Sequence, residues 1–185
     1  TPLGTRNKMI VAFSGKMVAY DITTGDPVWF GPDGGSGYSS PQLFNLNGEE
    51  QVVFMSKQGS LSIEPGSGKK IWEYKWEIQD RILQPSYIEG NDLLLSGENK
   101  SIRRVSVKKE ADIYKVEKLW ESSDYKVNFN DFIIHKGYAY AFDGPYLTCL
   151  NLKDGKRMWR GARYRGFQIL LADQDLLLIL TEKGE

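Results

Sequence analysis

The sequence predicts an all-β fold, a β-propeller of four-stranded antiparallel blades, and three observations lead to this prediction. A phrase made of a polar residue, a glycine and a tryptophan, spaced four positions apart, recurs along the chain. Tryptophans 29, 72, 120 and 159 lie 43, 48 and 39 residues apart, a period typical of propeller blades. Apolar residues often alternate with polar ones, and no stretch keeps the helical spacing over three turns.

The recurring phrase has three clear copies and one loose copy. In each clear copy an apolar residue comes directly before the tryptophan, and the copies are Asp21, Gly25 and Trp29; Glu64, Gly68 and Trp72; and Asn151, Gly155 and Trp159. The loose copy ends at Trp120, and there a charged run over residues 108–112 replaces the glycine turn. The copies indicate an array of similar structural units.

The first two units are divided into short strands by turn residues. In the first unit we expect strands at 9–13, 17–21 and 28–30, which are the later strands of a blade, with Thr1 and Pro2 as the stub of its first strand. In the second unit glycine-containing turns separate the predicted strands, because glycine readily takes the positive φ of tight hairpins. These strands are 40–45, 51–56, 60–64 and 70–74.

The same plan continues to the end of the chain. The third unit has predicted strands at 83–88, 92–96, 102–107 and 116–121, and the fourth at 132–135, 138–142, 147–152 and 157–160. Strands at 167–172 and 175–181 begin a fifth unit that lacks the phrase. We therefore expect one propeller domain over 1–185, with three whole blades and two partial ones, in units 1–30, 38–74, 82–121, 128–160 and 166–185.

An open array of blades would expose strand edges that a closed ring protects. We therefore expect a segment of a seven- or eight-bladed ring. The ring would be completed by the remaining blades of the parent chain or by a second copy of this chain.

Composition narrows the classes of partner. Lysine plus arginine and aspartate plus glutamate each number 24, so the net charge gives no reason to expect nucleic acid as a partner. No apolar stretch approaches the roughly 18 residues needed to span a bilayer. Thr1 does not begin a signal peptide, and the single cysteine, Cys149, excludes an intrachain disulfide.

Residues 20–29 (YDITTGDPVW), residues 150–159 (LNLKDGKRMW) and the opening GYSSP at 37–41 resemble the pyrroloquinoline-quinone-like propeller repeat family. In that family the tryptophan of the phrase docks one blade against another. The family includes calcium-dependent quinoprotein dehydrogenases, the outer-membrane assembly lipoprotein that scaffolds β-barrel insertion, and uncharacterised exported bacterial proteins, which this chain resembles most. The resemblance implies a periplasmic or otherwise exported binding or scaffolding module, with no cofactor expected.

The alternative implied by the resemblance is part of an alcohol or sugar dehydrogenase that uses pyrroloquinoline quinone and calcium. In several such enzymes a disulfide between adjacent cysteines faces the quinone, and Cys149 has no neighbouring cysteine. Calcium prefers six to eight oxygen ligands, and the one acid-amide cluster at a blade opening is Asn128, Asn130 and Asp131. Asp131 is either a general base or part of a polar loop that enters a strand.

Connections between blades reach the mouth of a propeller's central channel, where loops from several blades converge. Here they carry Tyr38, Ser39, Gln84, Asn128, Asn130, Asp131, Arg163, Tyr164 and Arg165. Because the arginine fork pairs with carboxylate or phosphate, these residues favour a polar or anionic ligand or a protein partner. The alternative is an ordinary solvated loop surface.

Three further residues have alternative interpretations. Trp76 lies outside the docking register and is either an exposed anchor for a partner or buried under the blade edge. His135 is the only histidine and, with no nucleophile elbow in the chain, is interpreted as structural. Cys149 is interpreted as a small buried apolar residue.

Overall fold

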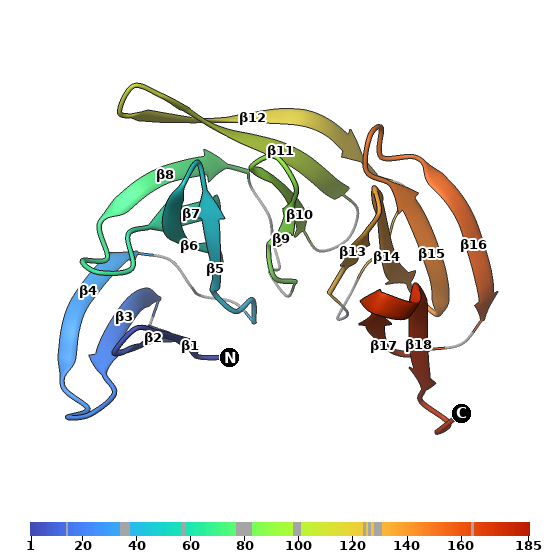
Figure 1. The fold of residues 1–185 in the computed structure, drawn as a ribbon, viewed down its shortest axis with the longest axis horizontal. Helices are drawn as coiled ribbons and strands as arrows, with labels where there is room; N and C mark the ends of the chain where they lie inside the picture. The colour runs from blue at the N-terminus through green and yellow to red at the C-terminus, as the bar shows by residue number, and fades with distance from the viewer. Residues whose placement is uncertain are drawn as a thin grey trace.

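The computed structural model describes residues 1–13, 15–33, 38–56, 58–76, 83–97, 101–123, 125, 127, 131–163 and 165–185. These residues form five antiparallel sheets that follow one another around an open arc (Figure 1). The first strands of neighbouring sheets lie on the inner side of the arc, and the fourth strands lie on the outer side. The all-β propeller-type fold predicted from the sequence is therefore confirmed.

Strands within each sheet pair in chain order. The first sheet contains β1 (Leu3–Thr5), β2 (Lys8–Phe13), β3 (Lys16–Asp21) and β4 (Pro27–Asp33), and the second contains β5 (Gln42–Leu46), β6 (Glu49–Ser56), β7 (Gly59–Ile63) and β8 (Lys70–Lys75). The third contains β9 (Ser86–Ile88), β10 (Asp92–Gly97), β11 (Ser101–Glu110) and β12 (Ile113–Ser122). The fourth contains β13 (Ile133–His135), β14 (Tyr138–Asp143), β15 (Tyr146–Asn151) and β16 (Arg157–Arg163). The fifth has two strands, β17 (Gly166–Leu171) and β18 (Leu176–Thr181), joined by the 3-10 helix η1 (Ala172–Gln174).

The first sheet differs from the sequence prediction, because it has all four strands. The strand that the prediction left out is β1, which pairs with β2 through Leu3 opposite Ile10 and Thr5 opposite Lys8. A three-residue strand is too short to show an alternating pattern, and the expectation of a stub at Thr1 and Pro2 was wrong. The described residues therefore contain four four-stranded sheets and one two-stranded sheet.

The third sheet also differs, because its charged run is part of a long hairpin. Strands β11 and β12 extend past the other sheets, and Figure 1 shows the hairpin reaching over β8. Ion pairs across the two strands offset the exposed charges; in one of them Lys108 Nζ lies 2.7 Å from Glu117 Oε2. The turn that replaces the predicted loop contains Ala111 at φ 53°.

Apolar cores fill the junctions between sheets rather than one central body. Successive residues of a strand point to opposite faces, so a sheet in the middle of the array supplies both of its neighbours. In β6, Val52 and Phe54 pack against the first sheet, whereas Val53 and Met55 pack against the third. The junction of the third and fourth sheets buries a further cluster that includes Ile88, Leu94 and Leu152.

Helical structure is almost absent from the described part of the chain. Its one helix is the three-residue η1, and no helix there has the length and apolarity needed to cross a membrane.

Candidate functional site

The tryptophan of one sheet packs on the glycine of the next sheet in two of the three junctions between four-stranded sheets. A Cβ atom on Gly68 would lie 2.5 Å from Cε3 of Trp29, and one on Gly155 would lie 2.7 Å from Cε3 of Trp120. Both indoles also donate a hydrogen bond across the junction, from Trp29 to the Pro65 carbonyl at 3.1 Å and from Trp120 to the Leu152 carbonyl at 2.8 Å. These residues hold neighbouring sheets together.

Trp72 is held differently, because the third unit has no glycine at the corresponding position. Its indole N–H donates to Gln51 Oε1 at 2.7 Å within the second sheet, and Ser62 Oγ donates to the same oxygen at 2.8 Å. Tyr114 from the long hairpin packs against the cluster that contains Trp72. Trp159, by contrast, is 43% exposed, and its ring centroid lies 6.1 Å from that of Tyr140.

The polar residue that opens each phrase shapes the turn before the glycine. Asp21 Oδ1 accepts hydrogen bonds from the backbone N–H groups of Thr23 at 2.7 Å and Thr24 at 3.1 Å. These two bonds lower the pKa of the Asp21 carboxyl below its usual value. Glu64 and Asn151 accept comparable backbone bonds in their own turns. All three residues therefore support the turn and form no ligand site with one another.

Two of the predicted channel-mouth residues meet directly. The backbone N–H of Gln84 donates to Asp131 Oδ1 at 3.0 Å, and partial burial raises the pKa of the Asp131 carboxyl above its usual value. Gln42 hydrogen-bonds to Gln84, and Gln168 Nε2 donates to the Asp131 carbonyl at 3.2 Å. A chain of hydrogen bonds from Gln42 through Gln84 and Asp131 to Gln168 thus links the inner ends of the second to fifth sheets. The predicted Asn128 and Asn130 lie outside the described residues.

Tyr38 and Ser39 lie at the entry to the second sheet. The Tyr38 side chain is 86% exposed, whereas Ser39 is buried and its hydroxyl has no hydrogen-bond partner among the described residues. The ring of polar side chains predicted at the channel mouth is therefore seen here as separate groups: the pair at the second sheet, the Gln84 and Asp131 contact, and an arginine pair.

The arginine pair, Arg163 and Arg165, borders a hollow of about 520 Å³ at the connection between the fourth and fifth sheets. Both residues are exposed, and neither guanidinium forms an ion pair within the described part of the chain. The predicted Tyr164 between them lies outside the described residues. The other lining residues are Pro145, Thr181, Glu182, Lys183 and Glu185. We call this the arginine hollow.

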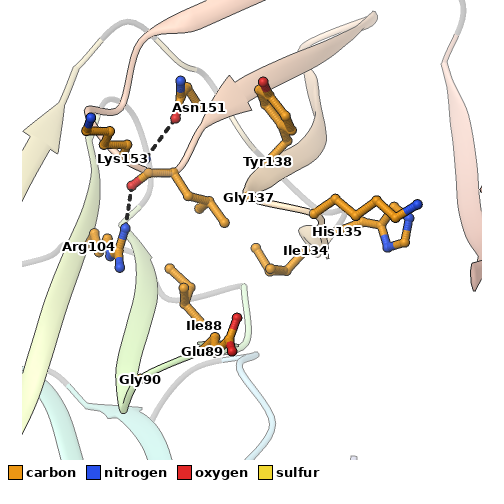
Figure 2. A pocket seen from close by; sticks show the side chains of 12 residues that line it. Ile88, Glu89, Gly90, Arg104, Ile134, His135, Gly137, Tyr138, Asn151 and Lys153 are labelled. Atoms are coloured by element: carbon orange, nitrogen blue, oxygen red, sulfur yellow. Dashed lines mark hydrogen bonds between the residues drawn. The ribbon is translucent and has the colours of Figure 1, made fainter.

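A second hollow, which the sequence did not predict, lies at the opposite end of β14 and β15 (Figure 2). It measures about 650 Å³ and is formed by the β9–β10 turn, the β13–β14 turn and the turn after β15. Its lining residues are Ile88, Glu89, Gly90, Arg104, Ile134, His135, Lys136, Gly137, Tyr138, Asn151, Leu152 and Lys153. We call this the interblade cleft.

The remaining candidates are placed by their contacts. Trp76 is buried, and the Arg103 guanidinium lies 4.3 Å from its ring centroid, so burial under the blade edge is correct and an exposed anchor is not. His135 Nε2 lies 2.8 Å from Asp175 Oδ1, which connects the fourth sheet to the fifth. Cys149 is buried, and burial raises the pKa of its thiol.

A calcium site of the dehydrogenase type needs several converging oxygen ligands. Within the described ranges, no group of three or more histidine, cysteine, aspartate or glutamate side chains is placed to hold a metal ion. Asp131 itself is engaged by the Gln84 backbone. Asn128 and Asn130, which complete the predicted cluster with Asp131, lie outside the described residues, so the calcium site stays a prediction.

No protein-family model and no curated protein matches the sequence. Among solved structures, the crystal structure of BamB from Moraxella catarrhalis is similar, with a TM-score of 0.59 and 13% sequence identity. The match covers 96% of this chain and 70% of that chain. At this level of identity the similarity shows the β-propeller fold, which the two proteins share.

Proposed function

We propose that this chain is a non-catalytic binding or scaffolding module, exported to the periplasm, that holds an acidic segment of a partner protein in the arginine hollow. The observation that carries the proposal is the pair of exposed guanidiniums, Arg163 and Arg165, at one concave surface. A guanidinium presents a planar fork of donors that matches a carboxylate, and two forks at one site favour a ligand with more than one negative charge.

The position of the hollow supports a binding role. It opens at the connection between two sheets, and loops that rigid sheets position in this way often carry binding functions. The similarity of the fold to BamB and the resemblance of the phrases to exported members of the repeat family also support a scaffolding role and an exported location.

The test uses fluorescein-labelled hexaglutamate as the acidic probe and fluorescence anisotropy as the measurement. The double substitution Arg163→Gln and Arg165→Gln should weaken binding about tenfold or more, because two charge-assisted contacts are lost. Binding to the unmodified chain should also fall as salt rises from about 0.05 to 0.3 M, because exposed charges are screened. Thermal unfolding should be nearly unchanged, since substitutions of exposed side chains rarely alter stability by more than about 0.5 kcal/mol.

The matched control is Arg6→Gln, which removes one exposed arginine from the β1–β2 turn of the first sheet, at the other end of the arc from β16 and β17 (Figure 1). Arg6 pairs with Glu50 at 2.8 Å. This variant should bind hexaglutamate as the unmodified chain does. Equal affinities for the double variant and the unmodified chain, with both folded, would overturn the proposal.

A further inference from the structure

We infer that the interblade cleft binds the side chain of a lysine presented by a partner chain. The aliphatic stem would lie against Ile88, Ile134 and Leu152, and the ammonium group would meet the Glu89 carboxylate. This site is separate from the arginine hollow, because Tyr138 and Asn151 at the cleft and Pro145 and Arg163 at the hollow lie at opposite ends of β14 to β16.

The cleft exists because two turns that meet in the preceding junction do not meet here. Between the second and third sheets, Asn47 N donates to Asn91 Oδ1 at 2.7 Å and Asn47 Nδ2 donates to the Val107 carbonyl at 3.0 Å. Between the third and fourth sheets the facing turns carry Gly90 and Gly137, and no hydrogen bond joins them among the described residues. Glycine has no side chain to bridge the gap, so the space stays open.

The floor of the cleft is apolar. Ile88 and Leu152 belong to the buried core of the junction, and Ile134 is partly buried beside it. In Figure 2 the side chains of Ile88 and Ile134 both point into the space between the two sheets. An aliphatic chain in contact with them would leave water, and each buried methylene contributes roughly 0.8 kcal/mol.

The cations around the cleft are mostly engaged elsewhere. Arg104 Nε donates to Asp92 Oδ2 at 2.7 Å, and its Nη1 donates to the Leu152 carbonyl at 2.8 Å. Lys136 Nζ lies 2.5 Å from Asp175 of the fifth sheet, and His135 contacts the same carboxylate. Figure 2 shows His135 directed away from the apolar floor.

Glu89 is the one carboxylate among the residues that line the cleft, and Lys153 is the one lining cation with no ion pair among the described residues. Glu89 is exposed at the rim, and it forms no ion pair with the described residues. Lys153, on the opposite rim, points away from Ile88 and Ile134 in Figure 2. An apolar floor with one unpaired carboxylate at its edge suits a long alkyl chain that ends in a cation, and a lysine side chain has this form.

The experiment is a titration of the full chain, with carbon-13-labelled isoleucine and leucine methyl groups, against ethylammonium, propylammonium and butylammonium. We expect shifts at the methyls of Ile88, Ile134 and Leu152, and an affinity that rises about two- to fourfold with each added methylene. Glu89→Gln should weaken butylammonium binding about two- to fivefold, the range expected for one exposed ion pair. Asp173→Asn, which removes an exposed carboxylate from η1, should leave it unchanged.

Four outcomes would overturn the inference. They are the absence of shifts at the three cleft residues, equal affinities for the three alkylammonium ions, unchanged affinity in Glu89→Gln, and stronger shifts with pentanoate than with butylammonium.

A second titration tests whether the cation belongs to a lysine of a protein chain or to a free diamine. Nα-acetyl-lysine amide should bind at least as tightly as free cadaverine, and tighter binding of cadaverine would overturn the assignment to a partner chain. The Arg163→Gln and Arg165→Gln variant should titrate like the unmodified chain, so failure of the proposed acidic-partner site would leave this result intact.

Discussion

The second-to-third and third-to-fourth junctions use the same strand geometry but close in different ways. In the former, Trp72 turns back to Gln51 of its own sheet, and Asn47 joins the exposed turns. In the latter, Trp120 docks on Gly155 of the next sheet, and the turns stay apart around the interblade cleft.

The comparison shows that the tryptophan–glycine contact and the contact between the facing turns are independent of each other. The glycine and tryptophan contact sets how two sheets stack, whereas the side chains at the facing turns decide whether the junction is closed. The third-to-fourth junction therefore has the tryptophan–glycine contact and still contains an open cleft. The second-to-third junction lacks that contact and is still well packed.

The largest effect should come from breaking the docking contact. Gly155→Ala places a Cβ atom 2.7 Å from Trp120 Cε3 at a residue whose φ is +73°, so steric overlap adds to backbone strain. We expect a loss of about 3 kcal/mol in the free energy of unfolding, measured by urea denaturation. Gly25→Ala is the control, because its φ is +78° but no atom lies within 4 Å of the added Cβ. It should cost about 1 kcal/mol, and equal losses would mean that the tryptophan contact is unimportant.

A smaller effect should come from removing the side-chain contact that joins the facing turns of the second-to-third junction. Asn47→Gly removes the side-chain donor to the Val107 carbonyl, while the residue's φ of 54° suits glycine. We expect a loss of about 1 kcal/mol in urea denaturation, the usual value of one hydrogen bond. Unchanged stability would show that Asn47 is not what closes this junction.

The smallest effect should come from the hairpin that covers the closed junction. Tyr114 Oη donates to Glu49 Oε2 at 2.8 Å, and burial together with the Glu49 carboxylate raises the pKa of Tyr114 to about 12. Because the folded-state pKa lies above the unfolded value of about 10, the neutral phenol stabilises the fold below pH 10, and this contribution is lost as pH rises toward 12.

Tyr114→Phe should therefore reduce stability slightly, by under about 1 kcal/mol at pH 8, and the gap between variant and unmodified chain should shrink as pH rises past 10. Urea denaturation at pH 8, 9, 10 and 10.5 measures it. A gap that grows with pH would contradict the assignment.

Much of the fold was predictable because its signals are local. The tryptophan period and the glycine turns mark the units, and alternation within each strand marks the faces, as Val52 and Val53 show by packing into different junctions. The strand β1 was missed because three residues carry no pattern. The hairpin of β11 and β12 was underestimated because ion pairs across the strands, such as Lys108 with Glu117, make a charged run compatible with a sheet.

The site was less predictable because it depends on residues that meet across junctions. Arg163 and Arg165 were identified because the short connection between two sheets brings them together in sequence as well as in space. The interblade cleft has no signal of this kind. It arises where Gly90 and Gly137, from turns of different sheets, leave a space that an asparagine fills in the preceding junction.

The direction of tryptophan docking limits which sheets of such an array can be duplicated or exchanged. Each docking indole packs on a glycine of the sheet that follows, so a duplicated sheet keeps the docking contact on both sides of a new place only if it has both the tryptophan and the receiving glycine. The third sheet offers Trp120 but has no receiving glycine, and its hairpin packs against the cluster around Trp72 instead. The second and third sheets are therefore expected to be exchanged by recombination only as a pair.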